Sequence, residues 1–245
     1  MQPIKIQIPD HLILPFGTAR KFDIGSIKLS AAAANGIYLT SDVPCVYIDR
    51  TKKEPLMMSD WKVLPNHVDE VLNYMFCSEN PMGILDHIHT WVEECMPVDT
   101  TTTPYERMFL RLYFDYIKGC LKHAYPCRGN PWLLWNALLP IPQMHLYVYD
   151  PLEDDRSGSL EPSNNFKVDF GFWTGTRLIA AEIDGDKPSG YLIRRDRLLR
   201  RAGVDVIHIL NTEIKEHGRG VIQTLFPREI TDDWQEDRFD RPIKY

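Results

Sequence analysis

The sequence predicts an α/β protein in which a central mixed sheet flanked by helices forms a core over residues 101–245. From residue 100 onward, segments with helical spacing and β-type runs follow in the order helix, strand, strand, strand, helix, strand. The first hundred residues predict a separate α+β segment, because short β-type runs there precede two apolar stripes at helical spacing. The segment "CMPVDTTTTP" interrupts both patterns with Pro and Thr and marks the boundary near residue 100.

The N-terminal segment 1–100 is predicted from runs that Pro, Gly and Asp separate. Three of these runs are typical of strands: "IKIQI", "GIYLT" and "CVYID". Apolar residues at helical spacing then predict two helices, one over residues 68–76 and one over residues 84–95.

The core begins with a long helix, because Thr103 is a suitable N-cap and Pro104 suits the first helical position. A strand over "MHLYVYD" and a polar loop follow. The runs "FKVDFGFW" and "TRLIAAEIDG" predict two strands joined by the turn "TGT". A helix over "SGYLIRRDRLLRRAG", closed by Gly203, leads into the strand "VDVIHIL".

Composition narrows the class of protein. A chain of 245 residues with 44% hydrophobic residues suits one largish domain, or a small domain attached to a medium one. No apolar run approaches the roughly 20 residues that span a bilayer, and the first residues lack a signal-peptide pattern, so we expect a soluble cytoplasmic protein. The five cysteines never form a CxxC pair, which argues against a disulfide framework or a zinc ribbon.

Carboxylates gather at the ends of two predicted strands. Asp169 lies between aromatic residues, and Glu182 follows the apolar run "LIAA". An acid in such a setting is costly unless something pairs with it. Strand alternation returns Asp184 to the face of Glu182, so the three acids form a hard-oxygen set suited to Mg²⁺ or Mn²⁺. The alternative is structural, since "IDGD" also suits a tight turn and acids also occur in ion pairs.

The run "VDFGFWTGTRLIAAEIDGDKPSGYLIRRDRLLRRAGVDVIHILNTEI" resembles the core of PD-(D/E)XK nucleases, and most closely the branch related to very-short-patch repair endonucleases. The shared features are a strand with Asp, a strand ending E-x-D-G, a helix with R-D-x-x-L and a G-x-x-V strand. The resemblance covers about residues 103 to 225 and implies a restriction-endonuclease-like core. It also implies that Asp169 and Glu182 bind the metal, with the backbone carbonyl of Ile183 as a frequent third ligand.

The sequence departs from the family pattern at two positions. Asp184 stands where the classical pattern carries a lysine that orients the attacking water, and it is therefore expected to bind a second ion or to position water. Pro188 stands where the related branch commonly has His. Lys187, just before it, is the candidate electrophilic partner, or else an exposed lysine. Glu106 has two interpretations, as a member of the metal and water network or as the acid of a capping box with Thr103.

The predicted helix after "EIDG" is rich in arginine, which gives an otherwise acidic chain of net charge −6 a local basic face. Phosphate contacts dominate DNA affinity, and these side chains are the candidates for making them. An ordinary solvated helix face is the alternative. The resemblance favours Arg195 and Asp196 as supporting residues near the site. The basic residues are Arg194, Arg195, Arg197, Arg200 and Arg201.

Together these features predict a nuclease that uses Mg²⁺ or Mn²⁺ to hydrolyse phosphodiester bonds in DNA, with a bacterial or phage defence or repair role implied by the resemblance alone. Two alternatives stay open: a catalytically inactive nucleic-acid-binding or scaffold module of the same fold, and an RNA-directed nuclease. The expected partner is nucleic acid, and the N-terminal segment is a candidate surface for a protein partner or for self-association.

Overall fold

The structure of the protein is a computed structural model that describes residues 10–17, 36–39, 44–58, 60, 81–96, 103–124, 137–148, 150, 164–185 and 190–226. The N-terminal elements are β1 (His11–Pro15), β2 (Gly36–Leu39), β3 (Pro44–Asp49) and α2 (Pro81–Glu94). The elements after residue 100 are α3 (Pro104–Ala124), β4 (Ile141–Val148), β5 (Asn164–Trp173), β6 (Leu178–Asp184), α6 (Gly190–Arg201), β7 (Val204–Leu210), α7 (Asn211–His217) and α8 (Gly220–Leu225).

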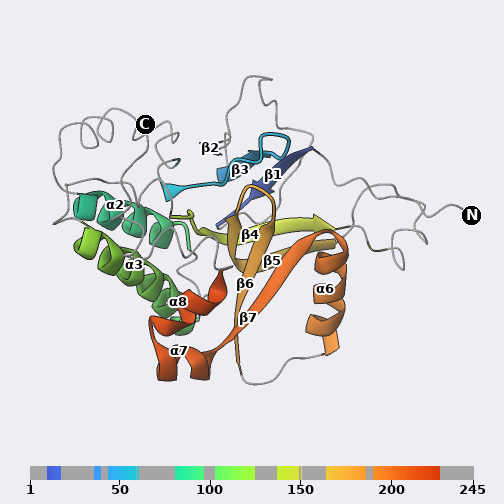
Figure 1. Ribbon diagram of the computed structural model, residues 1–245. Helices are drawn as coiled ribbons and strands as arrows, with labels where there is room; N and C mark the ends of the chain where they lie inside the picture. Colours follow the sequence, from blue (N-terminus) through green and yellow to red (C-terminus); the bar gives the residue numbers. More distant parts are fainter. Residues whose placement is uncertain are drawn as a thin grey trace, which may run out of the picture.

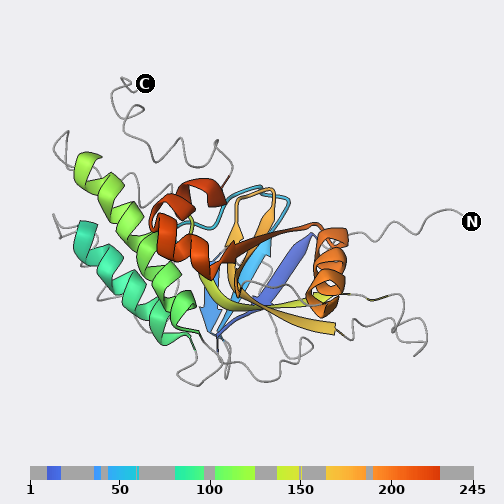
Figure 2. The same ribbon diagram turned by 90° about the horizontal axis from the view of Figure 1, so that it is seen from below.

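A four-stranded mixed sheet lies at the centre of the molecule, in the order β4-β5-β6-β7. Its first three strands are antiparallel, and β7 runs parallel to β6. Helices α2 and α3 lie on one side of this sheet and α6 on the other, as Figures 1 and 2 both show. The predicted general class, an α/β protein with a mixed sheet between helices, is therefore confirmed, as is the order of elements from α3 to β7.

The first strand of this sheet is longer than the sequence predicted. It begins at Ile141 rather than Met144 and so includes Pro142. Proline lacks the backbone N–H that a central strand needs, but β4 is the edge strand of the four-stranded sheet, where that loss is tolerated.

The N-terminal strands form a second, antiparallel sheet in the order β1-β3-β2. The runs "GIYLT" and "CVYID" supply β2 and β3, as predicted, whereas β1 was not predicted and the run "IKIQI" lies outside the described residues. The predicted helix at 68–76 also lies outside the described residues, whereas the helix predicted over 84–95 is present as α2. Backbone hydrogen bonds join this part to the core: Gly17 N–H donates to Pro142 O (3.1 Å) and Leu139 N–H to Leu56 O (3.0 Å). The division into segments 1–100 and 101–245 stays a prediction.

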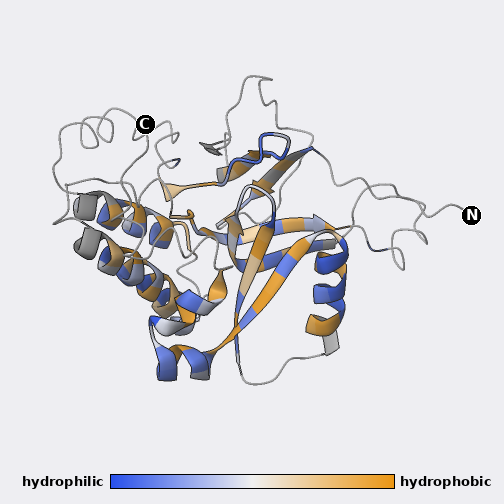
Figure 3. Ribbon diagram, viewed as in Figure 1, coloured by the Kyte–Doolittle hydropathy of each residue, from blue (hydrophilic) through white to orange (hydrophobic). Residues whose placement is uncertain are grey.

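Strand β5 separates two kinds of environment. Phe166, Val168, Phe170 and Phe172 alternate along one face and are all buried, as the sequence predicted. Aromatic residues of α3 pack against this face, with the ring of Phe109 centred 5.1 Å from that of Phe170. The other face carries Asp169. Figure 3 shows that the strands of this sheet are largely hydrophobic, whereas α6 is mostly hydrophilic.

The turn between β5 and β6 fixes which residues of the two strands face each other. It is tied by a hydrogen bond from Thr174 N–H to Arg177 O (3.0 Å), and Gly175 has a φ of 91°. A side chain at Gly175 would also meet Lys53 O, with the added Cβ only 2.5 Å away. Glycine therefore suits this position both for its backbone conformation and for its close approach to the N-terminal part.

Candidate active site

Asp169 and Glu182 occupy facing positions on β5 and β6. Phe170 pairs with Ala181, so the next position outward along the hairpin sets Asp169 opposite Glu182. The backbone N–H of Ile183 donates to Asp169 Oδ2 (2.7 Å). Burial and the nearby charge of Glu106 raise the pKa of Asp169 above its usual range, although the hydrogen bond from Ile183 opposes them.

Glu182 is buried, with 4% of its surface exposed. Burial and the neighbouring carboxyl of Asp169 raise its pKa above the usual range, and the guanidinium of Arg195 acts in the opposite direction. Arg195 is buried as well, and its Nη2 lies 3.1 Å from Glu182 Oε1. The sequence placed Arg195 among the phosphate-binding candidates, and the resemblance favoured it as a supporting residue near the site. It lies inside the protein, against an acid of that site.

Asp184 is held by a histidine. His208, on β7, bonds through Nδ1 to Asp184 Oδ2 and through Nε2 to Asp196 Oδ2, the latter at 2.6 Å. Both ring nitrogens face carboxylate oxygens, so both must donate, which makes the ring a cation. Burial lowers the pKa of His208, but the bonds to Asp184 and Asp196 outweigh it and the pKa is raised. Two carboxylates thus satisfy both nitrogens of this ring.

These contacts close on themselves. Arg195 Nη2 also lies 3.5 Å from Asp196 Oδ1. Successive polar contacts therefore lead from one acid of β6 to residues of α6, then to a residue of β7, and back to the second acid of β6. We call this set of residues the polar ring. Its members are Glu182, Arg195, Asp196, His208 and Asp184. Because both acids of "EID" are tied into this ring, α6 and β7 fix their positions.

Of the two interpretations of Glu106, the capping box is confirmed, and membership of a metal and water network stays a prediction. Glu106 forms the capping box with Thr103: Thr103 N–H donates to Glu106 Oε1 (2.8 Å), and Glu106 N–H donates to Thr103 Oγ1 (3.3 Å). It is also buried, with 3% of its surface exposed, and its charge acts on Asp169. Its second oxygen, Oε2, accepts a hydrogen bond from Gln143 Nε2 (2.6 Å).

Gln143 is the residue of this site that the sequence did not indicate. It has a φ of 51°, in the left-handed region that a non-glycine residue rarely adopts. Pro142 pairs with Phe170 and Met144 with Val168, so Gln143 lies between two ladder positions, level with Asp169. Its Oε1 is buried and accepts no hydrogen bond within the described part of the chain. A polar residue within the apolar run "LLPIPQMHLYV" was the available signal.

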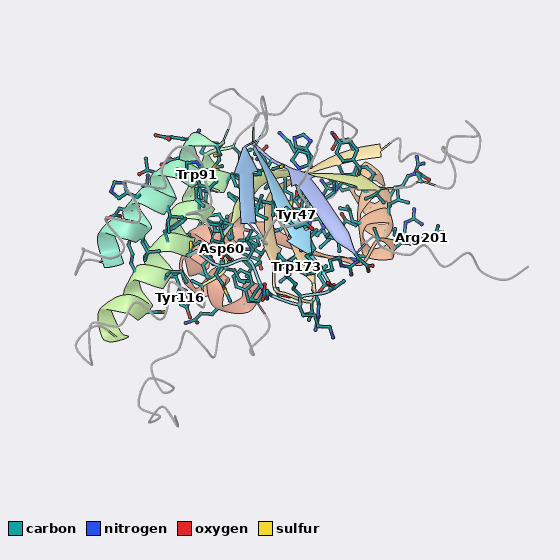
Figure 4. All side chains as sticks on the ribbon, turned by 90° about the horizontal axis from the view of Figure 1, so that it is seen from above. Tyr47, Asp60, Trp91, Tyr116, Trp173 and Arg201 are labelled. Atoms are coloured by element: carbon teal, nitrogen blue, oxygen red, sulfur yellow. The ribbon has the colours of Figure 1, made fainter. Side chains whose placement is uncertain are left out.

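The remaining candidates are spread along α6. Arg194 pairs with the buried Asp150, whereas Arg197, Arg200 and Arg201 are exposed. Figure 4 shows Arg201 on α6 and Trp91 on α2 towards opposite ends of the molecule, with the sheet between them. Lys187 and Pro188 lie outside the described residues.

Counting charges shows what the site lacks. Within the part of the chain that the structure describes, five carboxyl groups, those of Glu106, Asp169, Glu182, Asp184 and Asp196, meet two buried or half-buried cations, Arg195 and His208. The surplus acids must hold protons or a cation from solution. Among the residues that the structure describes, no group of three or more His, Cys, Asp or Glu side chains is placed to hold one ion. Mg²⁺, however, often binds one or two carboxylates and keeps several waters, and Asp169 with Glu182 fits that requirement.

Comparisons with known proteins add no relative: no family model, no curated protein and no solved structure matches the chain. Within the described ranges, no helix is both long and apolar enough to cross a membrane.

Proposed function

We propose that the protein is a divalent-metal-dependent nuclease that hydrolyses phosphodiester bonds in DNA, built on a restriction-endonuclease-like core. One observation carries the proposal: Asp169 and Glu182 face each other on adjacent strands with raised pKa values, and the described residues supply too few cations to balance them. Paired acids of this kind favour an ion that replaces the proton they otherwise hold. The resemblance to PD-(D/E)XK nucleases concerns these same positions.

Each residue of the site has a role in this proposal. Asp169 and Glu182 bind Mg²⁺ or Mn²⁺, with the carbonyl of Ile183 as a third ligand. The bound ion would polarise a phosphoryl oxygen and lower the pKa of an attacking water. Glu106 orders water beside Asp169 with the help of Gln143, the exposed arginines of α6 contact the nucleic acid, and Lys187 is the candidate electrophilic partner.

The role of Asp184 needs one change. Asp184 bonds through Oδ2 to the protonated ring of His208, and this neighbouring positive charge weakens the attraction of the carboxylate for a second ion. We therefore assign Asp184 to positioning: together with Arg195, Asp196 and His208 it holds β6 so that Glu182 faces Asp169. Arg195 belongs to this group rather than to the phosphate contacts, because it is buried.

A second function has a specific observation in its favour. Arg195 lies beside Glu182, and His208 bonds to Asp184, so each acid of "EID" has a neighbouring cation without a metal. A catalytically inactive nucleic-acid-binding or scaffold module of the same fold would keep these contacts. An RNA-directed nuclease would use the same residues to cut RNA in place of DNA, so only the identity of the substrate distinguishes it from the first proposal.

The experiment is a cleavage assay on supercoiled, linear and single-stranded DNA and on RNA, with Mg²⁺, Mn²⁺ or a chelator. Asp169→Asn removes the charge and keeps the size of the side chain, so we expect it to reduce metal-dependent cleavage by more than about 100-fold, beyond the loss typical of residues that merely support a metal ligand. The matched control is Asp205→Asn, an exposed acid paired with Arg177 at the surface. Binding without cutting by the wild type supports the inactive module, and cutting of RNA alone supports the RNA-directed enzyme.

A further inference from the structure

The polar face of β5 opens to solvent at one end. Asn165 and Lys167 are exposed and Asp169 is partly buried, whereas Gly171 and Trp173 are buried. All five share this face by strand alternation. Among the described residues of this face, those nearest Asp169 on its exposed side are therefore Lys167 and Asn165.

The neighbouring strand supplies a neutral partner at this entrance. His145 of β4 pairs with Lys167 across the ladder, and its Nδ1 lies 3.1 Å from Asn165 Oδ1. The amide oxygen only accepts, so Nδ1 carries the hydrogen and donates it. Burial lowers the pKa of His145, the hydrogen bond to Asn165 opposes this, the charge of Lys167 adds to the lowering, and the net shift is downward. The ring is therefore neutral at pH 7, which leaves Lys167 as the cation of this patch.

Lys167 is also uncommitted. It makes no ion pair with any residue that the structure describes, although its charge acts on Asp169 two positions along the strand. The two cations deeper in the site differ from it, since Arg195 is paired with Glu182 and His208 with Asp184 and Asp196. A phosphate that approaches five acids is repelled unless a free cation meets it.

We propose that Lys167, beside His145 and Asn165, forms a binding site for a backbone phosphate of the nucleic acid strand next to Asp169. The proposal rests on the proposed function, because it names the group that receives the substrate at that same site. Lys167 then supplies at the entrance the positive charge that position 184 does not carry.

The test measures binding apart from cleavage. We would follow the anisotropy of a fluorescent DNA duplex, and of an RNA strand, without metal over a range of salt concentrations, with Lys167→Met, Lys167→Arg and wild type. One lost phosphate contact reduces the slope of log K against log salt by about 0.9 on duplex DNA, which corresponds to about eightfold weaker binding at 0.1 M salt relative to a 1 M reference. Lys167→Arg should keep the wild-type slope. The control is Lys52→Met, an exposed lysine that pairs locally with Asp49.

The outcomes separate the two proposals. An unchanged slope and affinity in Lys167→Met, or a change no larger than that of Lys52→Met, overturns the phosphate site even if the wild type cleaves DNA. A reduced slope in Lys167→Met alone supports it, and if the wild type then cleaves nothing with Mg²⁺ or Mn²⁺, only the hydrolytic function fails. A wild type that binds neither DNA nor RNA overturns both.

Discussion

The two faces of β5 place opposite demands on the same ten residues. One face is aromatic and closed: Phe170 and Phe172 meet the rings of Phe109 and Tyr113 on α3, with centroids 5.1 and 5.5 Å apart. The other face is polar and open at one end, and there Asp169 meets Glu182 and the polar ring. Apolar burial stabilises the first face, whereas the second removes charge from water and leaves it only partly compensated.

The difference indicates where stability and chemistry are separated in this protein. Side-chain volume should matter most on the aromatic face, because close-packed interiors tolerate little loss of contact. On the polar face, charge should matter more than volume, because acids with raised pKa values are held there at a cost to the free energy of unfolding. Adjacent residues of one strand can therefore respond to substitution in opposite ways.

The largest contrast is expected between Phe170 and Asp169. Phe170→Ala leaves a cavity under α3 and should reduce the free energy of unfolding by about 3–5 kcal/mol. Asp169→Asn removes a desolvated charge, so the stability of the metal-free protein should stay the same or rise. Chemical denaturation of both variants at pH 7.5 measures the difference. A loss in Asp169→Asn as large as that in Phe170→Ala would show that the acid is a structural requirement of the fold.

The aromatic face was predictable from the sequence and the polar face only in part. Alternation and helical spacing depend on local order in the chain, so Phe170, Phe109 and the order of elements followed directly from them. The carboxylates were also visible, because acids between apolar residues are unusual.

Residues that act across the fold were harder to predict. The pairing of His208 with Asp184 and Asp196 depends on β7 lying parallel to β6 beneath α6, which sequence spacing does not specify. Gln143 reaches Glu106 through a left-handed backbone conformation that no neighbouring glycine signals. The resemblance favoured Arg195 as a supporting residue, but spacing alone did not separate it from its exposed neighbours, because the side of a helix that becomes buried depends on what packs against it.

The next contrast lies within α6, between a buried and an exposed arginine. Arg195→Met leaves Glu182 buried without its cation and should reduce the free energy of unfolding by about 3 kcal/mol at pH 7.5. Arg197→Met, on the exposed side, should change it by less than about 0.5 kcal/mol. Thermal and urea unfolding of both variants measures this.

Charge removal at Glu182 distinguishes a lost ion pair from lost packing. If Arg195→Met destabilises the protein because it leaves the Glu182 carboxylate buried without a cation, adding Glu182→Gln should recover most of the lost free energy of unfolding. If the double variant is as unstable as Arg195→Met alone, the arginine stem contributes by packing, and the polar ring is not an electrostatic unit.

The smallest expected effect is a change in how steeply the free energy of unfolding depends on pH. Burial raises the pKa of Asp169 to about 7 in the folded state, so between about pH 4 and about pH 7 the unfolded chain loses this proton while the folded protein keeps it. The folded state then binds more protons, and the free energy of unfolding falls as pH rises, by at most about 1.4 kcal/mol per pH unit for one proton. Asp169→Asn should show a shallower fall than the wild type, as measured by denaturation at a series of pH values.

Saturating Mn²⁺ should also change the pH dependence of the free energy of unfolding. An ion bound by Asp169 and Glu182 replaces the retained proton, so it should stabilise the wild type more at high pH than at low pH and reduce the fall in stability. In Asp169→Asn, Mn²⁺ should have little effect at any pH. If Mn²⁺ leaves the wild-type slope unchanged and gives no stabilisation, these acids keep protons in place of a metal, and the polar face then favours the inactive module over the nuclease.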